Sequence, residues 1–297
     1  MKKKLQKNIF LTGLSLSIIL IALLNIDRAT DKKALVESSY SKTLKFVFEV
    51  KNESNNVIKD SKFATYLPIE SDHQRVGNLK VSRDYSVAKS ANGNRVLEAK
   101  LDLIPPYGTR KISVSADISV VSSANTASVL PDGSYLSAEK YIEIEDQKIA
   151  TLAKELSGDT KKQTATNIYN WVVQNIGDSG YTSQDKGALF ALESGKGDCT
   201  EFMYLTIALA RASGIYARGV GGYVYRQSTL VKSADYHNWA ELYFDDQWHV
   251  IDSQKKVFSD QSGDYISMRH LSDKKLSLLG TSHRFSVVDE NLKVKML

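Results

Sequence analysis

The chain has 297 residues, a formal charge of +5 at pH 7, 42% hydrophobic residues and one cysteine. This length is enough for two domains with ordinary cores, and the composition is that of a globular protein. Lysines at positions 2, 3, 4 and 7 supply part of the charge, and no RNA- or DNA-binding motif accompanies it, so we expect no nucleic-acid partner. The five histidines are scattered and there is no second cysteine, so we expect no metal and no cofactor.

An almost uncharged apolar stretch, Ile9–Ile26, follows the lysines and ends before Asp27-Arg28. It is close to the minimum length that spans a bilayer and is longer than most signal-peptide cores. No small-x-small cleavage pattern follows it. We therefore predict that residues 1–28 form an uncleaved signal anchor in the cytoplasmic membrane, with the rest of the chain on the outer, periplasmic side. Cleavage, which would release a secreted chain, is the alternative.

Residues 32–122 show the alternation of apolar and polar residues that is typical of strands. The alternating runs are 44–50, 97–103 and 112–120, and turns are expected at Asn92-Gly93 and Pro105–Gly108. We predict a small antiparallel sandwich of the immunoglobulin-like type. In one interpretation, this sandwich binds a protein partner. Its only histidine, His73, is expected in a solvated loop.

Residues 123–135, which contain Pro131-Asp132-Gly133, are expected to form a linker, and residues 136–297 a second domain that mixes helices and strands. Two helices are predicted there, at about 144–156 and 161–176.

The only cysteine lies at the predicted start of a third helix. Asp198 and Glu201 have the spacing of a capping box, which makes Cys199 the first helical residue. The positive end of a helix dipole stabilises a thiolate, so we expect the pKa of Cys199 to be lowered. Gly214 is expected to end this helix. A lone free thiol outside the cytoplasm favours a catalytic role over a packing role.

Two strands connected by Asp245-Asp246 are predicted downstream as a hairpin. A two-residue turn places Trp239 opposite Asp252, and His237 has the same parity as Trp239. His237 and Asp252 are therefore diagonal neighbours on one face, roughly 7 Å apart at the backbone and within reach of each other's side chains. His249 lies on the opposite face, which excludes it as the base.

The order Cys199, His237, Asp252, within GKGDCTEFMYLTIALARASGIYARGVGGYVY and YHNWAELYFDDQWHVIDS, resembles the transglutaminase-like superfamily. The similarity covers about residues 135–290. It implies an α+β fold with a papain-like core and a Cys-His-Asp triad. Asp252 is followed by Ser253-Gln254, where such proteins often carry a proline.

The roles of these residues follow from the chemistry of a thiolate nucleophile. Cys199 attacks a carbonyl, His237 protonates the leaving amine, and Asp252 holds the imidazole. The Cys199 backbone amide is expected as one oxyanion donor. The candidates for the second donor are Tyr181 and Gln184.

Two further features near the site allow two interpretations each. Trp239 either shields the ion pair from water or only packs. The strand with Gly219, Gly221 and Gly222 indicates close approach by a ligand or by a neighbouring part of the chain.

Three classes of function remain open. The first is a cysteine amidase or peptidase that acts on a protein or peptide, and the second is an acyl transferase that crosslinks glutamine to an amine. The third is a non-enzymatic scaffold that uses the β-sandwich for binding. We favour the first, because no long insertion between Cys199 and Asp252 is available to exclude water from a thioester.

Overall fold

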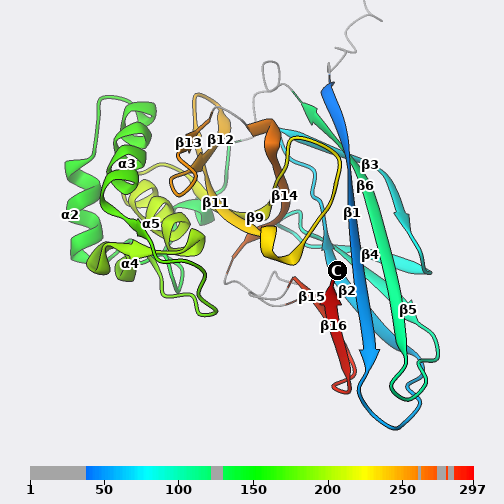
Figure 1. Cartoon of the computed structure of the whole chain (residues 1–297). Helices are drawn as coiled ribbons and strands as arrows, with labels where there is room; N and C mark the ends of the chain where they lie inside the picture. The colour runs from blue at the N-terminus through cyan, green and yellow to red at the C-terminus, as the bar shows by residue number, and fades with distance from the viewer. Residues whose placement is uncertain (1–37, 122–129, 260–261, 273–278, 280–283) are drawn as a thin grey trace, which may run out of the picture. The chain divides into compact units, whose positions relative to one another are not determined.

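The computed structural model describes residues 38–121, 130–259, 262–272, 279 and 284–297 (Figure 1). The predicted signal anchor, residues 1–28, lies outside this range. Among the helices of the described residues, none is both long and apolar enough to cross a membrane. Residues Ser38–Leu297 form one compact unit.

The N-terminal part is β-rich, as the alternating runs predict. One sheet contains β1 (Ser38–Asn52), β6 (Thr109–Val121) and β3 (Gln74–Val81), and the other contains β2 (Ser61–Leu67), β5 (Arg95–Leu101) and β4 (Tyr85–Lys89). These strands pair antiparallel with their neighbours. Alternate residues of β1, namely Leu44, Phe46, Phe48 and Val50, are buried in the core between the sheets, as expected for strands with one apolar face.

Segments from the end of the chain complete both sheets, which the sequence did not indicate. β16 (Leu292–Met296) pairs with β1, and β15 (Phe285–Val287) pairs with β2 (Figure 1). β10 (Thr229–Leu230) adds a short parallel bridge to β1. The division into domains 32–122, 123–135 and 136–297 stays a prediction, and part of the linker lies outside the described residues.

His73 lies in the loop between β2 and β3, as expected, but the expectation that it is solvated is wrong. The residue is half-buried, and Nε2 lies 2.7 Å from the carbonyl oxygen of Trp248. Because Trp248 is in the hairpin that follows His237, this contact ties the N-terminal region to the mixed α/β region.

The second region packs helices against a five-stranded sheet of order β13-β12-β11-β9-β14. The helices are α2 (Gln147–Glu155), α3 (Lys161–Asn175), α4 (Ala188–Ser194) and α5 (Cys199–Ala212). The strands are β9 (Ala217–Val224), β11 (His237–Phe244), β12 (Gln247–Asp252), β13 (Val257–Phe258) and β14 (Tyr265–Leu271). Short elements are β7 (Gly177–Asp178), β8 (Lys196–Gly197), and 3-10 turns at Gly133–Leu136, Ser233–Asp235 and Ser262–Asp264.

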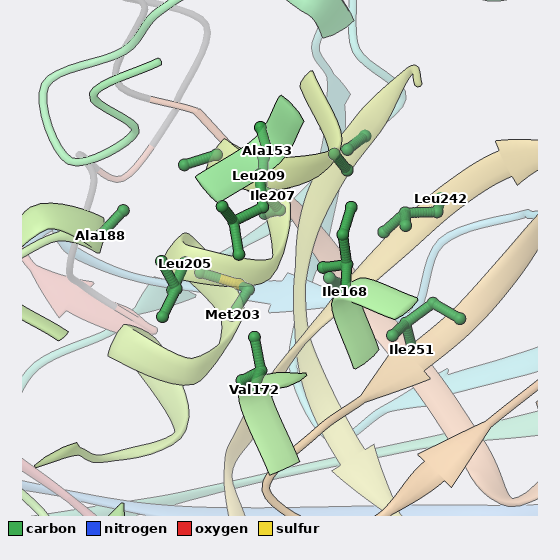
Figure 2. Packing of buried hydrophobic residues seen from close by; sticks show 14 of the residues in the cluster. Ala153, Ile168, Val172, Ala188, Met203, Leu205, Ile207, Leu209, Leu242 and Ile251 are labelled. Carbon is green, nitrogen blue, oxygen red and sulfur yellow. The ribbon is translucent and has the colours of Figure 1, made fainter. Parts of the chain in front are cut away.

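Helix α5 is the central element of this region. Leu205, Ile207 and Leu209 are fully buried, and they pack with residues of α3 and of the sheet in one apolar cluster (Figure 2). Gly214, with φ of 74°, follows the C-cap Ser213 in the left-handed conformation that ends many helices. Because α5 is surrounded by core on most sides, its first residue is held in a fixed place.

Candidate active site

The predicted capping box at the start of α5 is confirmed. Asp198 Oδ1 accepts from the Thr200 N–H at 2.8 Å, and Glu201 Oε2 accepts from the Asp198 N–H at 3.1 Å. Both carboxylates are buried. Each uses its second oxygen to hold the preceding loop, since Asp198 accepts from Thr182 N–H and Glu201 accepts from Lys186 N–H, both at 2.9 Å. The cap therefore also fixes the loop that approaches Cys199.

Cys199 is partly buried at the first position of α5. Burial raises the pKa of its thiol to about 11, and Asp198 and Asp252 act in the same direction. Hydrogen bonds from the Asn238 backbone and the Thr200 side chain oppose this shift. The expected lowering of the Cys199 pKa is therefore wrong, because the loss of solvation exceeds what the Asn238 and Thr200 donors return to the thiolate.

The hairpin has the predicted register. Tyr243 pairs with Trp248 and Ala240 with Ile251, so that Trp239 and Asp252 follow as the next opposed positions. Asp245 and Asp246 both have positive φ, 49° and 59°, which is the conformation of a two-residue type I′ turn.

His237 and Asp252 are in direct contact. His237 Nε2 lies 2.6 Å from Asp252 Oδ2, and the side chains are 8% and 2% exposed. A carboxylate acceptor at Nε2 fixes the neutral tautomer with its proton there, which leaves Nδ1 as the acceptor nitrogen. Burial alone would raise the pKa of Asp252. The hydrogen bond and charge of His237, with donors from Lys255 and Tyr265, outweigh burial and lower that pKa.

Two donors that sequence reasoning missed also hold Asp252. The Tyr265 hydroxyl, from β14, donates to Oδ2 at 2.7 Å, and the Lys255 backbone N–H donates to Oδ1 at 3.0 Å. Burial raises the pKa of Tyr265, and the Asp252 charge adds to this effect, so the phenol stays protonated.

Trp239 is 1% exposed and lies between His237 and Tyr265. Its ring is stacked near the imidazole, with centroids 6.3 Å apart, and meets the Tyr265 ring edge-on at 5.0 Å. This position fits both interpretations made from the sequence, because the indole packs in an apolar cluster and also covers one side of His237.

The structure places the other candidates less directly. Tyr181 is 87% exposed, and Gln184 is exposed in the loop that Asp198 and Glu201 hold. Their role as oxyanion donors stays a prediction. His249 is not near Asp252: its ring nitrogens contact the Ser259 hydroxyl and the Phe244 carbonyl, in agreement with its exclusion as the base.

The glycines of β9 are required by close packing within the chain. A Cβ on Gly219 would lie 2.9 Å from the Met203 sulfur, and one on Gly222 would lie 2.0 Å from the Ile266 carbonyl oxygen. A Cβ on Gly221 would meet the Tyr236 hydroxyl at 2.0 Å. Of the two interpretations made from the sequence, packing accounts for all three positions.

A cavity of about 570 Å³ lies along α5, lined among others by Tyr141, Gln184, Asp185 and Tyr204. Tyr204 donates to Asp185 at 3.1 Å. Within the part of the chain that the structure describes, no group of three or more His, Cys, Asp or Glu residues is arranged to hold a metal ion.

Comparison with known proteins agrees with this geometry. Residues 150–253 match the model of the Transglutaminase-like superfamily, so the chain carries a domain of this superfamily and the resemblance seen in the sequence is confirmed. This range contains all three residues of the predicted triad. No curated protein matches the chain.

Several solved structures are similar to this chain at low sequence identity. A protein from Cytophaga hutchinsonii, described as a candidate cysteine protease, is 17% identical, with a TM-score of 0.56 over 87% of this chain and 92% of that one. The periplasmic domain of TgpA from Pseudomonas aeruginosa, bound to ethylmercury, is 15% identical, with a TM-score of 0.37 over 74% and 92%. Red sea bream transglutaminase is 13% identical, with a TM-score of 0.30 over 74% and 49%. The first similarity shows a common mixed α/β fold that includes the β-rich N-terminal region.

Proposed function

We propose that this chain is a cysteine amidase or peptidase that cleaves an amide bond in a protein or peptide substrate. The observation that carries the proposal is the buried His237–Asp252 contact. The adjacent residue, Asn238, directs its backbone N–H to the thiol of the only cysteine. A nucleophile on α5, a base on β11 and a group on β12 that orients the base are therefore close together, which is the arrangement that nucleophilic catalysis requires.

The proposed reaction begins with proton transfer. Because the thiol of Cys199 is protonated at neutral pH, His237 Nδ1 takes its proton as the sulfur attacks the substrate carbonyl carbon. The tetrahedral intermediate collapses to a thioester, and His237 donates the proton to the leaving amine. Water then attacks the thioester with His237 as base, which releases a carboxylic acid and restores the thiol. Asp252 stabilises the imidazolium that forms in each half.

One donor to the developing oxyanion is the Cys199 backbone N–H. As the first residue of α5 it has no intrahelical acceptor, whereas the capping box uses the N–H groups of Asp198 and Thr200. The N-terminus of the helix also favours negative charge at this place. Tyr181 and Gln184 remain the candidates for the second donor.

An acyl transferase that uses an amine in place of water is the alternative from the same residues. A transferase has to exclude water from the thioester, and the segment between Cys199 and Asp252 consists of α5, β9, a short crossover and the hairpin, with no long insertion to cover it. We therefore infer hydrolysis as the main outcome. In the cell, we infer that residues 1–28 anchor the chain and that the reaction takes place outside the cytoplasm.

Acyl trapping tests the proposal. A mixture of casein peptides is incubated with the full chain at neutral pH, quenched in acid, and Cys199 is examined by mass spectrometry for a thioester. We expect an acyl adduct and release of new carboxyl termini, both lost in Cys199→Ala. The matched control is Ser213→Ala, a small change at the other end of α5, which should retain both signals. Release that persists in Cys199→Ala would contradict the proposal.

The choice between water and amine needs one further reaction. With about 1 mM of a primary amine present, hydrolysis predicts mostly free acid, and predominant amide product would make the transferase correct.

A further inference from the structure

Tyr265 stands outside the roles given so far, although it contacts the buried carboxylate directly. Tyr265 begins β14, an edge strand that pairs with β9. Asp252 ends β12, which β11 and β9 separate from β14 in the strand order. The Tyr265 ring is 5% exposed and meets Trp239 edge-on. A tyrosine that spans these strands to place its hydroxyl 2.7 Å from Asp252 Oδ2 has a specific polar partner in addition to its packing.

The Tyr265 hydroxyl donates to the same Asp252 oxygen that accepts the hydrogen bond from His237. Oδ2 accepts from His237 Nε2 at 2.6 Å and from Tyr265 at 2.7 Å, and Oδ1 accepts from the Lys255 N–H. Two donors on one carboxylate oxygen restrict rotation of the carboxylate about its Cβ–Cγ bond. Hydrogen bonds to an ionised acceptor are also the strong ones in proteins.

We propose that Tyr265 is a positioning residue of the catalytic site: its hydroxyl fixes the Asp252 carboxylate toward His237 and takes up part of the negative charge that this carboxylate presents to the imidazole. This inference rests on the function proposed above and names a further member of the same site. A hydroxyl that donates to Oδ2 withdraws negative charge from it, because each donor satisfies part of the charge of the acceptor. Without that donor, Asp252 holds the His237 proton more tightly.

The groups that face His237 and Tyr265 determine the direction of the effect. His237 faces Asp252, and the thiol of Cys199 lies at the adjacent start of α5. The groups that act on Tyr265 are Asp252, Asp264 and Tyr169, all of which oppose its ionisation. The hydroxyl therefore remains a donor throughout the working pH range. Its removal should raise the pKa of His237 and leave the imidazolium a poorer acid toward the leaving amine.

The test compares Tyr265→Phe with a matched control in the full chain. Tyr223→Phe removes another buried hydroxyl, one that contacts the Met296 sulfur and Arg284 and not Asp252. Two readouts are recorded for each protein: the His237 pKa from a ¹³C-histidine NMR titration, assigned with His237→Ala, and turnover of casein peptides with kcat and KM separated. For Tyr265→Phe we expect a higher His237 pKa and a kcat lower by about 10- to 100-fold, the range typical of outer hydrogen-bond partners, with KM little changed. Tyr223→Phe should match the wild type.

Each outcome decides one question. If Tyr265→Phe leaves both the His237 pKa and kcat at the wild-type values, the positioning role is wrong, whatever the reaction. If KM rises while kcat and the His237 pKa stay the same, Tyr265 acts on binding and the inference is also wrong. If the wild type itself gives no turnover that depends on Cys199, the proposed function fails. The NMR titration then still tests the Tyr265–Asp252–His237 connection, because it needs no substrate.

Discussion

Alkylation of Cys199 by iodoacetamide should depend strongly on His237, and the structure gives the size of the effect. Without a base, a thiol pKa of about 11 leaves roughly one thiolate in 10⁴ at pH 7, against a few per cent for an ordinary thiol of pKa about 8.5. This is a deficit of about 300-fold. The higher nucleophilicity of the more basic thiolate returns about tenfold, so His237→Ala should react about 30-fold more slowly than a model thiol.

The pH dependence of the alkylation rate distinguishes the wild type, which has His237 as a base, from His237→Ala. In His237→Ala the whole range from about pH 6 to pH 9 lies below the thiol pKa, so the rate should rise about tenfold per pH unit. In the wild type, His237 accepts the thiol proton as the sulfur attacks. The wild-type rate should therefore exceed that of His237→Ala at each pH, and it should rise less steeply with pH.

Every thiol adduct in this assay reports on Cys199, because the chain contains only one cysteine. His249→Ala is the matched control. That ring contacts Ser259 and the Phe244 carbonyl and not Asp252, so its profile should follow the wild type. Equal rates and equal slopes for the wild type and His237→Ala would show that His237 does not accept the thiol proton, and the assignment of the nucleophile and base would fail.

Three further predictions concern other parts of the chain. Asp252→Asn should lower turnover by about four orders of magnitude with little change in melting temperature; full activity would exclude Asp252 as the group that orients the imidazole. Asp198→Ala should lower the free energy of unfolding by about 1–3 kcal/mol in urea titrations, because it removes a cap and the bond to the preceding loop. Asp146→Ala, which removes only the α2 cap, should cost about 1 kcal/mol, and equal losses would contradict the role of Asp198 in the loop. Finally, the full chain should stay in the membrane fraction after carbonate washing and a version that begins at Asp31 should be soluble, whereas a mature chain that lacks residues 1–26 would indicate a cleaved signal peptide.

Local patterns were sufficient for much of the site. The capping box at Asp198 and the hairpin turn at Asp245-Asp246 depend on residues a few positions apart, and their geometry is as predicted. The hairpin register then follows from parity alone, and it brings His237 and Asp252 together without any knowledge of the rest of the fold.

The features that sequence reasoning missed depend on contacts between distant parts of the chain. The dipole at the start of α5 is a local property, but burial of the thiol comes from the elements packed around it, and burial determines the direction of its pKa shift. Tyr265 is missed for a related reason. Its strand, β14, is buried on both faces, so it has no polar and apolar alternation from which to assign a face. Its neighbour is β9, not the adjacent hairpin in the sequence. Only the order of the strands places its hydroxyl beside Asp252, and a chain with the same hairpin but another edge strand would have the same predicted triad without this donor.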